Sequence, residues 1–449
     1  MSTPSEPHDR GPNIIGRADH NVSRKHMSRA ALKVLYRLHE SGYQAFLVGG
    51  AVRDLMLDGR PKDFDIATDA DPDQVHELFR NSRVIGRRFR LVHVRFGREI
   101  IEVATFRAAT DPDDGDSGTQ TDNEGRLLRD NAYGSIDDDV WRRDFTANAL
   151  YYNIADFTVW DYVNGADDVR DRRLQLIGEP ARRLREDPVR VLRAVRFAAK
   201  LDFTLEPQLK TAIAEHKELL SNVPPARLFD EFLKMFQAGF AARAYEQLDR
   251  FDVFGELFPD AALGLDAPDG EYFAQFIRLA LENTDRRVAE DKPITPMFLI
   301  AVFLWWPIKA RARALFEDDG MSPTQSLGAA TYDCLARQQS TISIPRRFTA
   351  PLREMLTLQP RFEKMAGGRA LGFLEHRRFR AAYDFMLLRS EIGEVPAETA
   401  AFWTHVQTLE TAERAAAFGL SEGGGQSSGS KRPRRRRRRA KSGAEGGND

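Results

Sequence analysis

A short apolar run followed by two glycines is the feature that most constrains how this chain folds. Residues 45–48 are apolar and predict a buried strand, and Gly49 and Gly50 then predict a tight turn. Residues 51–57 are predicted to continue as a helix whose first N–H groups face the turn. Because unpaired N–H groups at a helix start favour a bound anion, this strand–turn–helix unit is a candidate cradle for phosphate groups.

Two carboxylates follow the turn closely in the sequence. Asp63 and Asp65 lie two residues apart, so they share one face if residues 64–66 are extended. Mg²⁺ takes its oxygen ligands from a few carboxylates and from substrate phosphates, so the pair predicts a metal site. Glycine pairs and Asp-x-Asp patterns are each common by themselves, and the prediction therefore depends on their order and closeness.

Two later segments offer further polar residues. Residues 101–107 alternate like a strand and contain Glu102, which is either a third carboxylate of the site or an outward residue of an amphipathic strand. Residues 142–150 contain Arg143, Asp144 and Asn148. Because Asp144 and Asn148 are four residues apart, they are predicted to share one helix face, with Arg143 beside them.

Residues 187–200 predict a helix of mixed character. Pro188 suits a first helical position, and apolar residues recur at helical spacing behind it. Arg190 and Arg193 fall on another face of this helix. An Asp and an Arg three residues apart on such a helix can imitate the hydrogen-bonding edge of a base. The alternative is a solvated, salt-bridged helix face.

These segments, in this order, resemble the class II nucleotidyltransferases, the family of bacterial poly(A) polymerases and CCA-adding tRNA nucleotidyltransferases. Residues 161–168, with Asn164 and Gly165, resemble the family's flexible segment between catalytic head and neck. The resemblance implies that two Mg²⁺ ions are held by Asp63, Asp65 and Glu102, the catalytic residues. It also implies that Asp187 and Arg190 recognise the base. The residues implied to bind the nucleotide are Gly49, Gly50, Arg53, Asp54, Arg143, Asp144, Asn148, Asp187, Arg190 and Arg193.

Other segments resemble the bacterial poly(A) polymerase branch, namely residues 86–94, 127–131, 224–231, 344–348 and 376–389. The resemblance implies an adenylyltransferase that takes ATP as substrate and extends RNA 3' ends without a template. A CCA-adding enzyme is the first alternative, because the motif of Asp187 and Arg190 is shared with enzymes that accept both CTP and ATP. The second alternative, a non-catalytic RNA-binding protein on the same scaffold, is disfavoured by the intact carboxylates.

The expected fold is α+β and multidomain. A mixed-sheet nucleotidyltransferase head, like that of polymerase β, precedes an all-α neck and body and a disordered basic tail. The expected parts are an N-terminal extension (1–30), the head (31–160), the neck (161–260), the body (261–420) and the tail (421–449). Residues 111–125, rich in Gly and acidic residues, are expected to form a mobile surface loop of the head.

The net charge of −1 conceals an asymmetry between the tail and the rest of the chain. Residues 421–449 carry nine Lys or Arg and three Asp or Glu, which leaves 57 basic and 64 acidic residues elsewhere. Such a run predicts contact with RNA phosphates, and a localisation signal or a merely solubilising segment are the alternatives. The RNA-binding arginines of the tail are Arg434, Arg435, Arg436, Arg437, Arg438 and Arg439.

Several classes of protein are disfavoured by what the sequence lacks. The single cysteine, Cys334, excludes an intramolecular disulfide and a cysteine zinc cluster. The longest apolar run, residues 297–306, is too short to span a bilayer, and residues 1–29 do not resemble a signal peptide, so a cytoplasmic protein is expected. The histidines lack metal-ligand spacing, which argues against a fused phosphohydrolase.

The partners expected from the resemblance are ATP and single-stranded RNA 3' ends. RNA-decay machinery and an Sm-like RNA chaperone are candidate protein partners, and a monomer is expected. A basic surface would also allow peripheral association with a membrane.

Overall fold

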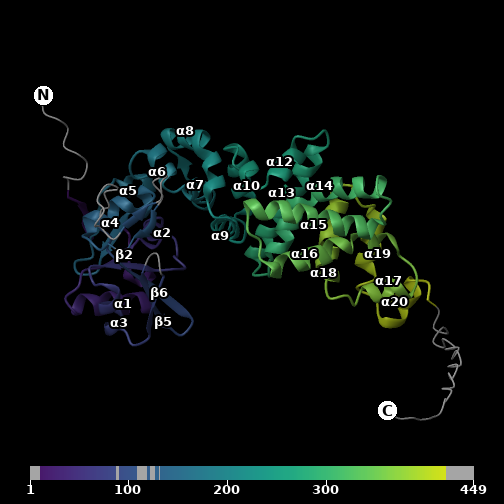
Figure 1. Cartoon of the computed structure of the whole chain (residues 1–449). Helices are drawn as coiled ribbons and strands as arrows, with labels where there is room; N and C mark the ends of the chain where they lie inside the picture. Colours follow the sequence, from purple (N-terminus) through teal and green to yellow (C-terminus); the bar gives the residue numbers. More distant parts are fainter. Residues whose placement is uncertain (1–10, 87–89, 109–118, 122–126, 131, 421–449) are drawn as a thin grey trace, which may run out of the picture. The chain divides into compact units, whose positions relative to one another are not determined.

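The computed structural model describes residues 11–86, 90–108, 119–121, 127–130 and 132–420. The chain divides into two units, Met1–Thr357 and Leu358–Asp449. The first unit combines a sheet with many helices, and the described part of the second is helical (Figure 1). The predicted α+β fold class is therefore confirmed.

An eight-stranded mixed sheet forms the head of the first unit. Its strand order is β1-β10-β9-β2-β3-β6-β5-β4, and all neighbours are antiparallel except β3 and β6. The strands are β1 (Asn13–Ile15), β2 (Ala45–Val48), β3 (Asp65–Thr68), β4 (Ser82–Ile85), β5 (Leu91–Phe96), β6 (Glu99–Thr105), β9 (Leu150–Asn153) and β10 (Val159–Asp161). Because β1 pairs with β10, part of the expected N-terminal extension is an edge strand of the head.

The register of the central strands places the polar residues of the predicted site. All four side chains of β2 are buried, as expected of a strand covered on both faces. In the parallel pair of β3 and β6, Asp65 lies opposite Glu102. Since residues opposite one another in a ladder point to the same face, both carboxylates emerge on one side of the sheet.

Short helices flank the sheet. Helix α1 packs against β2, β3 and β6 through an apolar face and begins at Ser28, whose hydroxyl accepts a hydrogen bond from the Ala31 N–H. The helices of this part of the chain are η2 (Arg24–His26), α1 (Arg29–Glu40), α2 (Gly50–Met56), α3 (Pro72–Leu78), α4 (Ile136–Arg142), η3 (Thr146–Asn148) and α5 (Gly165–Arg170). A separate antiparallel ladder joins β7 (Thr119–Thr121) and β8 (Leu127–Asp130).

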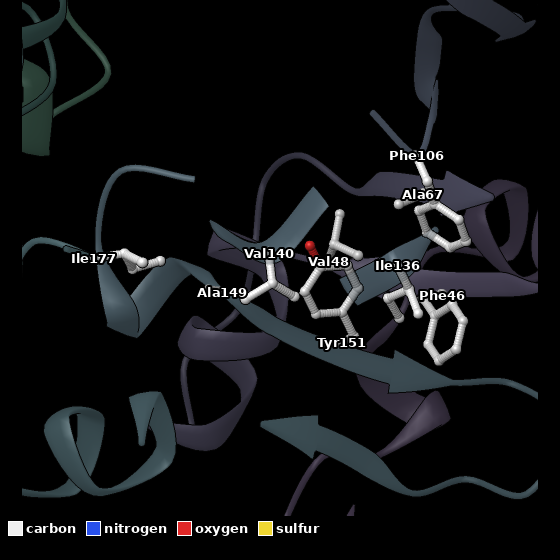
Figure 2. Packing of buried hydrophobic residues seen from close by; sticks show 9 residues of the cluster. All are labelled: Phe46, Val48, Ala67, Phe106, Ile136, Val140, Ala149, Tyr151 and Ile177. Atoms are coloured by element: carbon white, nitrogen blue, oxygen red, sulfur yellow. The ribbon is translucent and has the colours of Figure 1, made fainter. Parts of the chain in front are cut away.

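A buried cluster joins the sheet to α4. Its members come from β2, β3, α4, β9 and the segments between them (Figure 2). They are Phe46, Val48, Ala67, Phe106, Ile136, Val140, Ala149, Tyr151 and Ile177. This packing holds α4, through Ile136 and Val140, against the strand that precedes the glycine turn.

The neck is mainly helical. Its helices are α6 (Pro180–Glu186), α7 (Val189–Leu201), α8 (Pro207–His216), η4 (Lys217–Asn222), α9 (Pro225–Phe236) and α10 (Ala241–Arg250). The neck also contains a short parallel ladder of two-residue strands, β11 (Arg173–Leu174) and β12 (Thr204–Leu205), which was not predicted. In α7 the predicted apolar stripe is buried, and Pro188 caps the helix one residue before its start.

Long helices complete the first unit. They are α11 (Phe254–Leu257), α12 (Pro259–Leu265), α13 (Gly270–Ala289), α14 (Pro296–Glu317), α15 (Pro323–Thr341) and α16 (Arg346–Thr357). Pro307 lies inside α14, and Pro351 lies inside α16. An interior proline loses one backbone hydrogen bond, and the extensive burial along α14 offsets that loss. Phe303 of α14 contacts aromatic rings of α9, α10 and α11.

The described part of the second unit has its own aromatic core. Its helices are η5 (Gln359–Glu363), α17 (Gly368–Phe373), α18 (Phe379–Glu391), α19 (Ala397–His405) and α20 (Thr411–Ala417). Trp403 is fully buried among Phe362, Phe373 and Phe379, and its indole N–H donates to the Phe362 carbonyl at 2.8 Å. A buried indole with a satisfied N–H fixes how α19 packs.

No helix within the described ranges is long and apolar enough to cross a membrane. The apolar run at residues 297–306 lies inside α14, and most of its side chains are buried. Of the insertion at residues 111–125, Thr119–Thr121 forms β7, and the rest lies outside the described residues. The arginines of the tail, from Arg434 to Arg439, also lie outside them.

Candidate active site

The glycine turn forms between β2 and α2 as predicted. Gly49 has a φ of 68°, which disfavours residues with a Cβ. A Cβ at this position would lie 3.6 Å from Arg143 Nη1 and 3.7 Å from the Asn148 carbonyl oxygen. The turn therefore lies directly against the segment that contains Arg143 and Asn148.

Asp63 and Asp65 emerge on one face of the chain at the start of β3. Phe64 between them is buried, whereas both carboxylates are exposed to the cavity described below. Burial raises the pKa of Asp65 to about 6, Glu102 and Asp63 add to the increase, and Arg143 opposes it. A concentration of carboxylates whose charges repel one another suits a divalent cation, so this donor set fits Mg²⁺.

Glu102 lies opposite Asp65 in the ladder, but its side chain is turned towards β5. His93 Nε2 and Glu102 Oε1 are 3.2 Å apart, and the Glu102 side chain is 51% exposed. Glu102 is the one predicted catalytic residue that does not line the cavity. Within the part of the chain that the structure describes, no three His, Cys, Asp or Glu side chains are already grouped as a metal site.

Arg53 and Asp54 form a brace in the cavity wall. The Arg53 guanidinium is 2% exposed, and its Nε and Nη2 donate to Asp54 Oδ1 at 2.9 and 2.6 Å. Its Nη1 donates to the side-chain oxygen of Asn148. These contacts connect α2 to η3. The Arg53 guanidinium lines the cavity and is already hydrogen-bonded to Asp54 and Asn148.

Arg143, Asp144 and Asn148 come together, but not on one helix. The backbone is extended at Arg143 and Phe145, between α4 and the short η3. Asn148 nevertheless donates from Nδ2 to Asp144 Oδ1 at 3.4 Å. The four-residue spacing therefore predicted the neighbours correctly and the helix wrongly, because the turn between α4 and η3 is closed by contacts from distant segments.

Asp139 and Tyr151 hold Arg143 and were not predicted. Arg143 donates from Nε and Nη2 to Asp139 Oδ2 at 3.2 and 3.0 Å, and the Tyr151 hydroxyl donates to the same oxygen at 2.6 Å. Burial raises the pKa of Tyr151 well above its usual value, which keeps the phenol neutral. The spacing of four between Asp139 and Arg143 is a visible sequence signal, whereas Tyr151 gave none.

Asp187 and Arg190, the predicted base readers, are both paired with protein groups. Asp187 accepts from both terminal nitrogens of Arg227, at 3.1 and 3.0 Å. Arg190 donates from Nη1 to the Arg183 carbonyl at 2.6 Å. Asp187 and Arg227 are 40 positions apart in the sequence, which explains why no local pattern indicated their ion pair.

Arg193 connects the head to the neck. It donates from Nε to Asp144 Oδ2 at 2.6 Å, and its Nη1 lies 4.0 Å from Glu231 of α9. Burial by itself would raise the pKa of Asp144, but the charge and hydrogen bonds of Arg193 hold it below its usual value. Glu231, 4% exposed, also accepts from Arg196 at 2.9 Å.

The connection from head to neck is tightly folded where a flexible segment was expected. Asp161 accepts hydrogen bonds from the N–H groups of Val163, Gly165 and Ala166 at 2.9–3.1 Å. A Cβ on Gly165 would lie only 2.2 Å from the Thr146 carbonyl oxygen. The segment therefore packs directly against η3.

One cavity of about 1070 Å³ brings these groups together. It is lined by the glycine turn, by Asp63 and Asp65, and by residues of α7, α9 and α10. Every predicted nucleotide-binding residue lines it, namely Gly49, Gly50, Arg53, Asp54, Arg143, Asp144, Asn148, Asp187, Arg190 and Arg193. The structure brings these residues together, and their roles remain predictions.

Three family descriptions match successive parts of the chain. Residues 45–175 match the poly A polymerase head domain, residues 202–264 match a probable RNA- and SrmB-binding site of polymerase A, and residues 319–441 match the arginine-rich C-terminus of polymerase A. Together they cover more than half of the sequence.

Curated relatives and solved structures agree with these matches. Poly(A) polymerase I of Salmonella typhi is 46% identical over 84% of this chain and 82% of its own length. The CCA-adding enzyme of Bacillus subtilis is 39% identical, over 51% of this chain and 55% of its own. The crystal structure of the Bacillus stearothermophilus CCA-adding enzyme in complex with CTP superposes with a TM-score of 0.58 at 26% identity, covering 86% of this chain and 82% of that one.

Proposed function

Because the chain belongs to the poly(A) polymerase family of nucleotidyltransferases, we propose that it adds AMP from ATP to RNA 3' ends without a template. In this reaction the RNA 3'-hydroxyl attacks the α-phosphate of ATP, a new phosphodiester bond forms, and pyrophosphate leaves. The observation that carries the proposal is the single cavity that joins the glycine turn, the carboxylate pair and the cations of the neck.

The charge of the cavity suits two polyanionic substrates. Twelve of its lining residues are Lys or Arg, whereas six are Asp. The triphosphate is assigned to the glycine turn and Arg143, because the Arg143 guanidinium lies against that turn. Base recognition is assigned to Asp187 and Arg190 of the neck, and Asp144 and Asn148 are assigned to the ribose.

The carboxylates are assigned to Mg²⁺, with two ions as the family resemblance implies. Asp63 and Asp65 would hold the metal from one face of β3, and Glu102 would join them from β6. The bound ions would neutralise charge on the attacking and leaving oxygens of the in-line displacement. The donor set is hard and oxygen-rich, which matches Mg²⁺ rather than a zinc-type ion.

A CCA-adding activity is the second candidate function. It is favoured by the superposition on a CCA-adding enzyme, since the base-reading motif is common to both. Against it, the CCA-adding relative from Bacillus subtilis matches half of this chain, whereas the poly(A) polymerase from Salmonella typhi matches most of it at higher identity. The adenylyltransferase is therefore preferred.

The test is incorporation by the purified full chain with Mg²⁺ on two substrates, a generic RNA and a tRNA that lacks its CCA end. Each nucleoside triphosphate is supplied separately, and then ATP and CTP together. A long ladder on the generic RNA that needs only ATP is the expected result. Addition that stops after CCA on the tRNA would replace the proposal with the sister activity, and no incorporation on either substrate would leave an RNA-binding protein.

The finer assignments follow from the same family. We assign the head to residues 31–160, the neck to 161–260 and the body to 261–420, with the extension 1–30 and the tail 421–449 at the ends. The body so defined includes the boundary between Thr357 and Leu358. A cytoplasmic monomer that acts on single-stranded RNA 3' ends, with RNA-decay machinery or an Sm-like chaperone as partners, completes the proposal.

A further inference from the structure

A phenolic hydroxyl lies at the centre of the head's apolar cluster. Tyr151 of β9 is fully buried, and Figure 2 shows its ring in the cluster that also contains Val48, Val140 and Ala149. A buried hydroxyl is costly unless it is hydrogen-bonded. Its two partners are Asp139 Oδ2, to which it donates at 2.6 Å, and Arg143 Nε, from which it accepts at 2.5 Å.

These contacts hold one edge of the Arg143 guanidinium. Nε and Nη2 both donate to Asp139 Oδ2, at 3.2 and 3.0 Å, and Nε also donates to Tyr151. The ring of Tyr151 lies 4.7 Å beneath the guanidinium carbon. Asp139 is itself nearly buried, so the guanidinium and carboxylate neutralise each other inside the head.

The remaining nitrogen of Arg143 points to the glycine turn. Nη1 lies 3.6 Å from where a Cβ on Gly49 would be, and its hydrogen bond to the Asn148 carbonyl is long, at 3.5 Å. One edge of the guanidinium is therefore fixed by Asp139 and Tyr151, while Nη1 remains beside the backbone of the turn and the cavity.

We propose that Tyr151 and Asp139 are positioning residues that fix Arg143 for binding the triphosphate of the incoming nucleotide. The inference rests on the proposed function, because it takes the phosphates to lie at the glycine turn. A guanidinium fixed before binding loses less conformational entropy when it meets a phosphate oxygen. The Tyr151 hydroxyl thus contributes to nucleotide affinity although the apolar cluster separates it from solvent.

The first variant is Tyr151→Phe, which keeps the ring in the cluster and removes only the hydroxyl. The matched control is Tyr152→Phe, because Tyr152 is the next residue of β9, is 1% exposed and faces His20 on the other side of the sheet. Calorimetric titration of each full-length variant with ATP and then with adenosine, both with Mg²⁺, separates phosphate contacts from base contacts.

We expect the Kd for ATP to rise about tenfold in Tyr151→Phe, with adenosine affinity unchanged and Tyr152→Phe like the parent protein. Asp139→Asn, which keeps the shape but removes the charge, should give a larger loss for ATP. An unchanged ATP affinity in Tyr151→Phe, or an equal loss for ATP and adenosine, would overturn the inference.

A double-mutant cycle separates positioning of Arg143 from a general effect on the fold. In an Arg143→Lys background, Tyr151→Phe should cause no further loss of ATP affinity, since the planar guanidinium edge that the hydroxyl holds is gone. A full additional loss there would overturn the positioning role. ATP binding that depends on Tyr151 without any incorporation into RNA would refute the proposed function and leave this inference standing.

Discussion

Asp65 is surrounded by charges of both signs. Their balance disfavours the ionised form of its carboxylate unless a cation is bound beside it. Burial, Glu102 and Asp63 all raise its pKa, and Arg143 alone among the principal causes lowers it. A side chain in this situation contributes little to folding and is suited to bind a positively charged ligand. The residue is therefore expected to matter for activity far more than for stability.

Replacing Asp65 with Asn tests this separation. Adenylate transfer should fall at least about 1000-fold, because a metal held by carboxylates supplies several kcal/mol to the transition state. The thermal unfolding midpoint, measured without Mg²⁺, should stay constant or rise, since the variant removes a repelled carboxylate. Circular dichroism with an incorporation assay checks both expectations.

The exposed carboxylate Asp73 provides a matched control. It lies on α3, is 71% exposed and pairs with Arg90 away from the cavity lining. Asp73→Asn should leave incorporation within about twofold and stability within about 0.5 kcal/mol. An active Asp65→Asn enzyme would remove the basis of the metal assignment.

At the scale of elements, helices α7 and α9 are joined by a buried charge cluster. Glu231 of α9 accepts from Arg196 of α7 and from Lys234, both at 2.9 Å, and Arg193 lies within 4.0 Å. Since Arg193 also binds Asp144, the cluster continues into the head. Neutralising Glu231 would remove the ion pair of Arg196, whose side chain is 11% exposed, whereas Arg193 would keep its pair with Asp144.

We expect Glu231→Gln to lower the free energy of unfolding by about 3 kcal/mol at pH 7. Burial by itself would raise the pKa of Glu231, but Arg196 and Lys234 hold it below its usual value. The ion pairs therefore stabilise the fold above pH about 4.3 and are lost as the pH falls through the lower pKa of the folded state. Urea unfolding at pH 7 and at pH 4 should show the difference between variant and parent shrinking at the lower pH.

Lys234→Met is the control for this cluster, because Lys234 is 54% exposed and bonds the same carboxylate. Its cost should stay below about 1 kcal/mol, as for exposed ion pairs. Equal costs for the two variants would mean that the buried contacts of Glu231 with α7 contribute no more than the exposed one.

The contact between α5 and η3 depends on the absence of a side chain at Gly165. A Cβ there would lie 2.2 Å from the Thr146 carbonyl oxygen, which is backbone and cannot turn aside. Gly165→Ala should therefore destabilise the protein by about 3 kcal/mol and weaken activity, since η3 carries Asn148. Thermal unfolding and incorporation assays measure the two effects.

Gly372→Ala is the corresponding control. Gly372 lies within α17, and nothing lies within 4 Å of the position of an added Cβ. Alanine is the better helix former by about 0.5–1 kcal/mol, so this variant should be neutral or more stable. A Gly165→Ala protein as stable as the parent would show that α5 can move away from η3 at little cost.

At the scale of the whole molecule, the basic residues are unevenly distributed along the sequence. Residues 421–449 contain nine of the Lys and Arg residues, and the remainder of the chain is acidic overall. Binding of such a segment to RNA releases counter-ions, so its contribution should be strongest at low salt and nearly independent of RNA sequence.

Deletion of residues 421–449 should raise the apparent KM for RNA and flatten its dependence on salt. Each lost phosphate contact should reduce the slope of log affinity against log salt by about 0.7. Replacing the six arginines from Arg434 to Arg439 with lysine keeps the charge and should retain most of the binding. RNA affinity that is unchanged at low salt after the deletion would refute a role of the tail in binding.

Individual residues show which parts of the fold and of the site could be predicted from the sequence. The strand at residues 45–48, the glycine turn and the following helix were predicted from adjacent residues, because each depends on local burial and backbone freedom. Pro307 and Pro351 lie inside helices although proline disfavours the helix interior, because packing around α14 and α16 overrides this local preference. Arg227, Tyr151 and Glu231 were missed because their partners lie in other elements.

By itself, the sequence determined the family, the sheet-and-helix composition of the head and twelve of the residues that line the cavity, because these follow from local pattern and motif order. Only the tertiary structure decided which of those residues are already paired: Asp187 with Arg227, and Arg143 with Asp139 and Tyr151. It also decided that Glu102, although opposite Asp65, turns to His93. Pairing depends on distances between side chains of separate elements, and such distances exist only after the chain has packed.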